Sequence, residues 1–188
     1  MALPATMHQI VIALSDIDRG VYETLELRVA RHPSETVRYM LTRVLAYALS
    51  YEDGIAFSKG GLSSPDEAPV SIHDPTGILV AWIDIGQPSA ERLHRASKAA
   101  RRVALFTTTD LAQIQREAAK AAIHRAEHLA LCRIDPQFID ALEPLVGRRL
   151  ELELVRTEGR LYATVQGAPG ERATHLEGAL EETTLAGS

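Results

Sequence analysis

Two apolar segments joined by a turn, and followed by a basic helix and a third apolar segment, occupy residues 65–107 and limit how this chain can fold. The turn at residues 74–77 reads Asp-Pro-Thr-Gly, which is typical of a type I turn with proline at its second position. If the first and last of these residues end the turn, the flanking strands pair antiparallel and Asp84 lies opposite Glu67. Two acids that face each other destabilise a sheet unless a cation lies between them. A divalent metal is one such cation.

The same crowding of acids leads to a prediction about the folding stability of the metal-free protein. If Asp66, Glu67 and Asp84 converge without a metal, their repulsion costs folding free energy, so Asp84→Asn should leave the metal-free protein as stable or more stable. Added Mg²⁺ should then stabilise the wild type and not the variant.

The composition predicts one well-packed domain. The chain has 188 residues, of which 46% are hydrophobic, and this is enough for a single core. Residues 167–188 are rich in Gly, Ala, Thr and Glu, so we expect one domain over residues 1–166 and a loosely ordered tail after it. The single cysteine, Cys132, excludes a disulfide framework and favours a cytoplasmic location. The sequence has neither a signal-peptide pattern nor an apolar segment of membrane-spanning length, so we expect no membrane partner.

Periodicity and capping residues predict a mixed α+β fold. Residues 5–14 and 21–30 should form an antiparallel strand pair, and Ser34 should cap a helix over residues 34–50. A helix from Ser89 to about residue 100 should link the apolar run 78–86 to a parallel strand at 103–107. The other expected elements are a strand at 55–59 ended by Gly60-Gly61, a helix at 110–125 capped by Asp110, a strand at 129–134, a short helix from Asp135-Pro136 to about Val146, and a terminal hairpin of strands 150–156 and 160–165.

The predicted order helix, three strands, helix and strand over residues 34–107 resembles the restriction-endonuclease-like αβββαβ core of the PD-(D/E)xK nuclease superfamily. In this comparison the N-terminal and C-terminal β-hairpins are additions to a mixed sheet flanked by helices. Several short stretches resemble the bacterial YaeQ branch more closely. These are Ala-Arg-His-Pro-Ser-Glu at 30–35, Leu-Ala-Tyr-Ala-Leu at 45–49, Asp66-Glu67, Trp-Ile-Asp-Ile-Gly at 82–86 with Pro88, and Arg95-Ala96 before Val-Ala-Leu-Phe-Thr at 103–107.

The resemblance implies a metal-dependent phosphodiesterase or nuclease. In the superfamily, carboxylates hold Mg²⁺ or Mn²⁺, which binds the scissile phosphate and activates a water molecule. Pro65-Asp66 matches the PD of the motif and Asp84 matches its second acid, with Glu67 and Glu35 as further metal ligands. Gly86 stands where the motif has lysine, so the catalytic cation must come from elsewhere.

The basic helix after Gly86 offers two replacements for that lysine. Helix rise places Arg95 roughly 9 Å from the helix start and Lys98 roughly 13 Å from it. Counted back along the strand at about 3.3 Å per residue, Arg95 comes level with Asp84. Arg95 would act as an electrostatic clamp, since arginine does not serve as a base. The candidate catalytic residues are therefore Asp84, Arg95, Glu35 and Lys98.

The same residues allow a second hypothesis, a non-catalytic module that binds nucleic acid or a transcription-related protein. The missing lysine favours this alternative, and the net charge of −5 limits nucleic-acid binding to a local basic patch. Structural roles are open for several candidates: interaction with a helix dipole for Glu35, and a place in a solvated loop for Asp66 and Glu67. The pattern His-Arg-Ala-Glu-His at 124–128 matches a zinc-peptidase motif, but it runs into an expected strand, which the motif's helical geometry does not allow.

Overall fold

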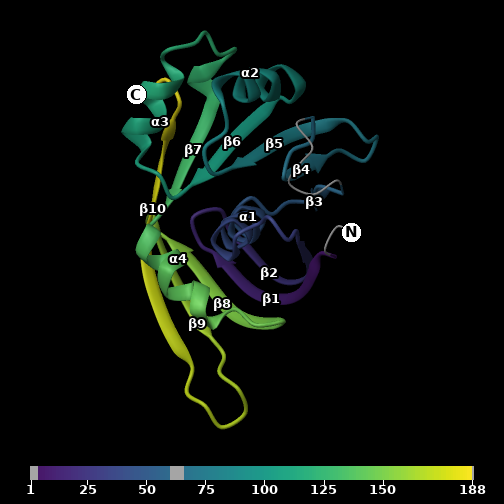
Figure 1. Cartoon of the computed structure of the whole chain (residues 1–188), viewed down its shortest axis with the longest axis vertical. Coiled ribbons are helices and arrows are strands. Elements are labelled where there is room, and N and C mark those ends of the chain that lie inside the picture. The colour runs from purple at the N-terminus through teal and green to yellow at the C-terminus, as the bar shows by residue number, and fades with distance from the viewer. Residues whose placement is uncertain (1–3, 60–65, 188) are drawn as a thin grey trace. The chain divides into compact units, whose positions relative to one another are not determined.

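The computed structural model describes residues 4–59 and 66–187, which form a mixed α+β fold. The chain divides into two compact units, and each is built from two segments (Figure 1). The first unit comprises Met1–Leu41 and Asp135–Leu180, and the second comprises Thr42–Ile134 and Glu181–Ser188. Helix α1 (Val37–Leu49) and strand β10 (Thr174–Thr184) each run from one unit into the other. The single domain expected over residues 1–166 stays a prediction.

The first unit is a sheet with the strand order β2-β1-β8-β9-β10. Its inward positions alternate along each strand, as Ile10, Ile12 and Leu14 show in β1, so the sheet buries one face. Both hairpins expected from the sequence are confirmed, and β1 and β8 pair in parallel between them. The elements are β1 (Thr6–Asp16), β2 (Val21–Arg31), α4 (Pro136–Leu142), the 3₁₀ helix η3 (Glu143–Leu145), β8 (Arg149–Thr157), β9 (Arg160–Val165) and most of β10.

The second unit is a mixed sheet with the strand order β7-β6-β5-β4-β3. The three strands β5, β6 and β7 run parallel, and helix α2 forms the predicted crossover between β5 and β6. Trp82, Leu93, Ala96, Leu105 and Ile114 belong to one buried cluster, which joins α2 and α3 to the sheet. The elements are β3 (Ile55–Phe57), β4 (Val70–His73), β5 (Leu79–Ile85), α2 (Ala90–Ala99), β6 (Arg102–Thr107), α3 (Leu111–Ala118), the 3₁₀ helix η2 (Ala126–His128) and β7 (Leu129–Ile134).

Helix α1 begins later than predicted. Its first residue is Val37, and its N-cap is Thr36, whose hydroxyl accepts a hydrogen bond of 3.1 Å from the Tyr39 amide. The predicted cap, Ser34, lies in a turn that the Glu35 amide closes on the His32 carbonyl at 2.8 Å. This turn occupies the residues that the sequence assigned to the first helical turn.

The turn between β4 and β5 forms, but it contains a bulge. The Gly77 amide donates to the Asp74 carbonyl at 2.9 Å, as in the predicted type I turn. The Asp74 amide, however, donates to the Ile78 carbonyl at 3.0 Å, and Gly77 has a left-handed φ of 86°. A type I turn followed by a left-handed glycine is the arrangement of a G1 bulge, which shifts the pairing by one residue.

A second irregularity after Ile72 shifts the register by one more residue, and Ile72 pairs with Ala81. Extended to the next position beyond β4, this register places Asp84 across from Pro69 and not across from Glu67. The predicted opposition of Asp84 and Glu67 is therefore wrong, because two bulges separate the observed pairing from that of a simple two-residue turn. The predicted break at Gly60-Gly61 and the Pro65 of the PD pair lie outside the described residues.

The C-terminal region also differs from the prediction. The loosely ordered tail expected from residue 167 contains β10, which pairs antiparallel with β9 from Thr174 onward and buries Leu180. A strand forms here because the edge of β9 supplies backbone partners, which compensate for the weak apolar pattern. Helix α3 ends at Ala118 and not near residue 125. No helix in the described part of the chain is long and apolar enough to cross a membrane.

Candidate functional site

The acid at the end of β5, Asp84, is buried, and both of its carboxylate oxygens accept hydrogen bonds. Asp84 is only 2% exposed, although it follows a run of apolar residues. One carboxylate oxygen, Oδ2, accepts hydrogen bonds from Arg92 Nε at 2.7 Å and from Trp82 Nε1 at 3.1 Å. The other oxygen, Oδ1, accepts one from the Ile85 amide at 3.2 Å. The negative charge is thus neutralised inside the second unit by the side chain of one arginine.

Arg92 reaches Asp84 from the first turn of α2. The hydroxyl of Ser89 caps this helix by accepting from the Arg92 amide at 3.2 Å, as the sequence predicts. The guanidinium also donates from Nη2 to the Glu67 carbonyl at 2.9 Å, and its carbon lies 5.4 Å from the centre of the Trp82 ring. Arg92 therefore joins α2, β5 and the loop before β4 through one planar group.

The ion-pair partner of Asp84 is Arg92, which lies three residues before Arg95, the arginine selected from the sequence. Arg95 instead lies beside Asp66, with 3.5 Å between Nη1 and Oδ1, and both side chains are largely exposed. The helix-rise estimate placed Arg95 level with Asp84, but Arg92 makes the contact, because the estimate ignored the reach of the side chain and the short connection between β5 and α2. Sequence reasoning missed Arg92, although its place three residues after the Ser89 cap puts it near the end of β5.

The remaining acidic and basic candidates have separate surroundings. Glu67 is exposed, and its Oε2 accepts a hydrogen bond of 2.6 Å from the Ser58 hydroxyl. Lys98 is exposed near the end of α2. Asp66 and Glu67 thus lie near the arginines of α2 and do not face Asp84 across the hairpin.

Glu35 belongs to the first unit and precedes α1, so it is not in the first helical turn. It is buried, and its Oε2 accepts a hydrogen bond of 3.2 Å from the His32 amide. Its carbonyl accepts another of 2.9 Å from Arg31 Nη1. These contacts hold the turn that leads into α1. The catalytic roles expected for Glu35, Asp84, Arg95 and Lys98 stay predictions.

The backbone conformation at residue 86 favours glycine. Its φ is 82°, and its amide donates to the Phe106 carbonyl at 2.8 Å. A residue with a side chain is strained in this left-handed region, whereas glycine adopts it freely. The geometry at the end of β5 therefore disfavours a lysine at position 86.

The arrangement around Asp84 does not fit a divalent metal. The Arg92 cation lies where a metal bound to Oδ2 would have to approach, and no three His, Cys, Asp or Glu side chains gather at ligand spacing anywhere in the described residues. The zinc-peptidase pattern at 124–128 also lacks the required helix: Arg125 is left-handed with φ 53°, and only the short η2 follows it. His128 lies 3.6 Å from its neighbour Glu127.

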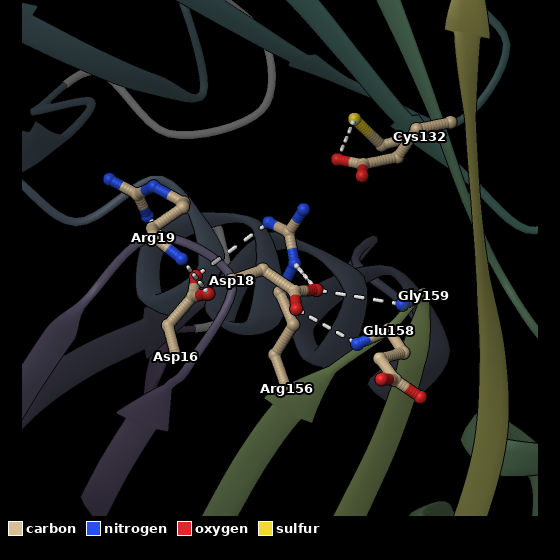
Figure 2. Close-up of polar contacts among 8 residues, drawn as sticks. Asp16, Asp18, Arg19, Cys132, Arg156, Glu158 and Gly159 are labelled. Atoms are coloured by element: carbon tan, nitrogen blue, oxygen red, sulfur yellow. Dashed lines mark hydrogen bonds and ion pairs between the residues drawn. The ribbon is translucent and has the colours of Figure 1, made fainter.

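A second polar cluster, which the sequence reasoning did not find, joins two turns of the first unit (Figure 2). Asp16 at the end of β1 is fully buried and lies 3.5 Å from Arg19 and 3.6 Å from Arg156. Asp18 Oδ1 accepts a hydrogen bond of 2.8 Å from the Glu158 amide in the β8–β9 turn. This backbone hydrogen bond, with the nearby Arg156 charge, lowers the pKa of Asp18. In the sequence, the only sign of this cluster was the turn-like composition of residues 15–20.

These features define a class: a mixed α+β protein in which a buried strand acid is paired with an arginine from the crossover helix. The family model described as YaeQ protein matches residues 1–171, and the chain belongs to the YaeQ family. The resemblance to the YaeQ family is thereby confirmed, and the placement in the PD-(D/E)xK superfamily stays a prediction.

The relatives cover most of this chain. The YaeQ proteins of Salmonella typhi and Escherichia coli (strain K12) are 29% and 28% identical to it over 163 residues, which are 86% of this chain and 90% of theirs. The crystal structure of YaeQ from Pseudomonas syringae has a TM-score of 0.84 at 30% identity, and covers 100% of this chain and 99% of its own. That of YaeQ from Xanthomonas axonopodis pv. citri has a TM-score of 0.80 at 29% identity, with 95% and 97% covered.

Proposed function

We propose that this chain is a cytoplasmic, non-catalytic protein that binds the phosphate backbone of nucleic acid through helix α2. The observation that carries the proposal is the pair between Asp84 and Arg92, at 2.7 Å. A carboxylate that is buried and already neutralised is poorly suited to bind a catalytic metal. The chemistry that α2 presents to solvent is then the basic side chains beyond Arg92.

The outward side of α2 carries a row of basic residues. Arg95, Lys98 and Arg101 follow Arg92 at intervals of three, and all three are exposed. Glu91 is the only acid within the helix. Arg101 follows two residues after the helix ends at Ala99. Residues three apart lie close together on a helical surface, so Arg95 and Lys98 form a local basic stripe on an otherwise acidic protein. Such a stripe is typical of backbone contacts to nucleic acid, which do not depend on base sequence.

Salt-dependent binding tests this proposal. We expect labelled single- or double-stranded DNA or RNA to bind in a fluorescence anisotropy assay without added metal, with an affinity that falls as salt rises. Lys98→Ala should weaken binding to every sequence and lower the slope of log K against log salt by about 0.7 to 0.9.

Arg116→Ala is the matched control, because Arg116 is an exposed residue of α3 and its replacement removes the same charge. If none of the four nucleic acids binds, or if the two variants weaken binding equally, the proposal is wrong. A transcription-related protein would then be the partner to test for a non-catalytic module.

A metal-dependent phosphodiesterase with a variant active site is the second candidate. The element order α1-β3-β4-β5-α2-β6 favours it, since this is the order of the nuclease-like core that the sequence resembles. In this reading Asp84, Asp66 and Glu67 of the second unit are the residues that would hold Mg²⁺ or Mn²⁺. Cleavage of DNA or RNA that requires either metal, and that is lost in both Asp84→Asn and Arg95→Ala, would favour this candidate over the first.

A further inference from the structure

We propose that the free edge of β2 pairs with β2 of a second copy of this chain, in an antiparallel register centred on Leu27. Strand β2 stands first in the strand order, and among the described residues it pairs only with β1. It has 11 residues and belongs wholly to the first unit. The edge of such a strand offers backbone groups to another strand. This self-association goes beyond the proposed function, which uses residues of the second unit.

The edge of β2 lacks the features by which proteins usually prevent such pairing. Lysine, proline, a bulge or a very short strand protects many natural edges. The sequence of β2 contains neither lysine nor proline. Its pairing with β1 runs without a register shift from Val21 to Arg31, so no bulge turns the edge away. The strand is therefore open to a partner along most of its length.

Hydrogen bonds on the other side of β1 show which residues of β2 face the free edge. The amides of Gln9 and Ile17 donate to carbonyls of β8 and of the residue before it, so odd-numbered residues here direct their backbone groups toward β8. Even-numbered residues of β1 face β2 and pair with odd-numbered residues there, as Ile10 does with Leu27. Because these directions alternate along a strand, the even-numbered residues of β2 face the free edge. The central ones are Thr24, Glu26 and Arg28.

The charges of β2 complement each other when a copy of the strand runs in the opposite direction. Glu26 and Arg28 are exposed, and among the described residues neither side chain makes a hydrogen bond or an ion pair. With Leu27 on the two-fold axis, Glu26 lies opposite Arg28 of the second copy, and symmetry repeats the pair. The same register places Glu23 opposite Arg31 of the second copy. Opposite charges that face each other across two strands stabilise the pairing.

The neighbouring symmetric registers are unfavourable. With the axis at Glu26, two glutamates lie opposite each other, and with the axis at Arg28, two arginines do. Like charges in these positions destabilise a strand pair. A shift of the axis by two residues in either direction loses the pairing between Glu26 and Arg28. Charge therefore selects the register centred on Leu27.

The apolar residues of β2 also fit this register. Leu25, Leu27 and Val29 are buried on the inner face of the sheet. In the proposed pairing Leu27 lies opposite its own copy, and Leu25 lies opposite Val29 of the second copy, so the apolar face continues across the junction. On the outer face Tyr22 is 62% exposed and would lie diagonally across from Ala30 of the second copy. A small residue there leaves room for the aromatic ring.

Sedimentation velocity of the full chain at low salt tests the dimer. We expect a reversible equilibrium of monomer and dimer that shifts toward monomer as salt screens the charges. Glu26→Arg and Arg28→Glu should each weaken association about tenfold or more, because attractive pairs become repulsive. Both side chains are exposed, so the melting temperature should change little.

An equal mixture of the two single variants gives the sharpest readout. Positions 26 and 28 are both basic in Glu26→Arg and both acidic in Arg28→Glu, so a heterodimer joins opposite charges at each central pair. The mixture should therefore associate more tightly than either variant alone. The double variant Glu26→Arg/Arg28→Glu should associate with itself as the wild type does. Glu153→Arg is the matched control, because Glu153 is exposed on β8, a strand that already pairs on both sides.

Several outcomes would overturn the proposal. One is a wild type that stays monomeric up to about 500 µM, a concentration at which even a weak specific interface is populated. Another is a dimer that persists in both single variants, since it would use a different surface. A mixture that associates no better than its components, or an equal loss in Glu153→Arg, would also contradict the pairing of Glu26 with Arg28.

Discussion

Removing the Asp84 carboxylate should destabilise the second unit strongly. In Asp84→Ala, Arg92 Nε and Trp82 Nε1 both lose their acceptor, at a site where the side chain of Asp84 is 3% exposed and that of Arg92 is 19% exposed. Loss of one partner from a buried ion pair costs about 3 to 5 kcal/mol. We expect a value near the lower limit, about 3 kcal/mol, because Arg92 can still reach water. For a chain of this length, that loss corresponds to a fall of roughly 6 to 12 °C in melting temperature.

The isosteric change Asp84→Asn isolates the charge. Asparagine can still accept from Trp82 Nε1, but it no longer neutralises Arg92, so we expect a loss of about 1.5 to 3 kcal/mol. Asp66→Ala is the control, because its pair with Arg95 is exposed and should contribute less than about 1 kcal/mol.

Urea unfolding monitored by tryptophan fluorescence measures these changes directly. Trp82 is the only tryptophan, and its indole donates to Asp84, so the signal comes from the site itself. A double-mutant cycle of Asp84→Asn with Arg92→Gln should give a coupling energy of about 1 to 3 kcal/mol. If Asp84→Asn is as stable as the wild type or more stable, the ion-pair role is wrong, and the mutual repulsion of acids expected from the sequence is correct.

Two further predictions concern the rest of the fold. The folded pKa of Asp18 is lowered, chiefly by the Glu158 amide, so the stability that Asp18 contributes is present above its unfolded pKa and is lost as pH falls through the lower folded value. Asp18→Asn should therefore be less stable than the wild type near neutral pH, and urea midpoints measured down to acidic pH should converge; a constant difference would contradict this. Gly54→Ala should cost more than about 2 kcal/mol, because φ is 88° and the new Cβ would lie 2.0 Å from the His73 carbonyl oxygen. Gly77→Ala, with a similar φ of 86° and open space, should cost only about 1 kcal/mol, and equal melting temperatures for the two variants would refute the steric argument.

The sequence predicted the elements well where periodicity and capping agree. The crossover through α2, its Ser89 cap, the Asp110 cap of α3 and both flanking hairpins are all present in the structure. These features depend on neighbours within a few residues, and such neighbours are visible in a sequence. The prediction of a loosely ordered tail was wrong, because β10 is stabilised by pairing with β9 and not by its own apolar pattern.

The candidate site could be predicted only in part. A buried apolar run that ends in Asp84 correctly marked this acid as unusual, but its partner depended on the register of a hairpin and on side-chain reach. Each of two bulges moved the register by one residue, and Gly77 was the only visible sign of the first. The partner, Arg92, was hidden among several basic residues of one helix. The sequence therefore predicted repulsion between Asp84 and another acid, whereas the structure pairs Asp84 with Arg92. The difference comes from small shifts in register that the local sequence does not reveal.

A calorimetric titration of Mn²⁺ or Mg²⁺ into the wild type and into Asp84→Asn tests the central claim most directly. Since Arg92 already neutralises Asp84, we expect the two proteins to give the same isotherm, with no binding event that depends on this carboxylate. A saturable metal site in the wild type that disappears in Asp84→Asn would contradict the claim and would show that the acid can exchange its arginine for a metal ion.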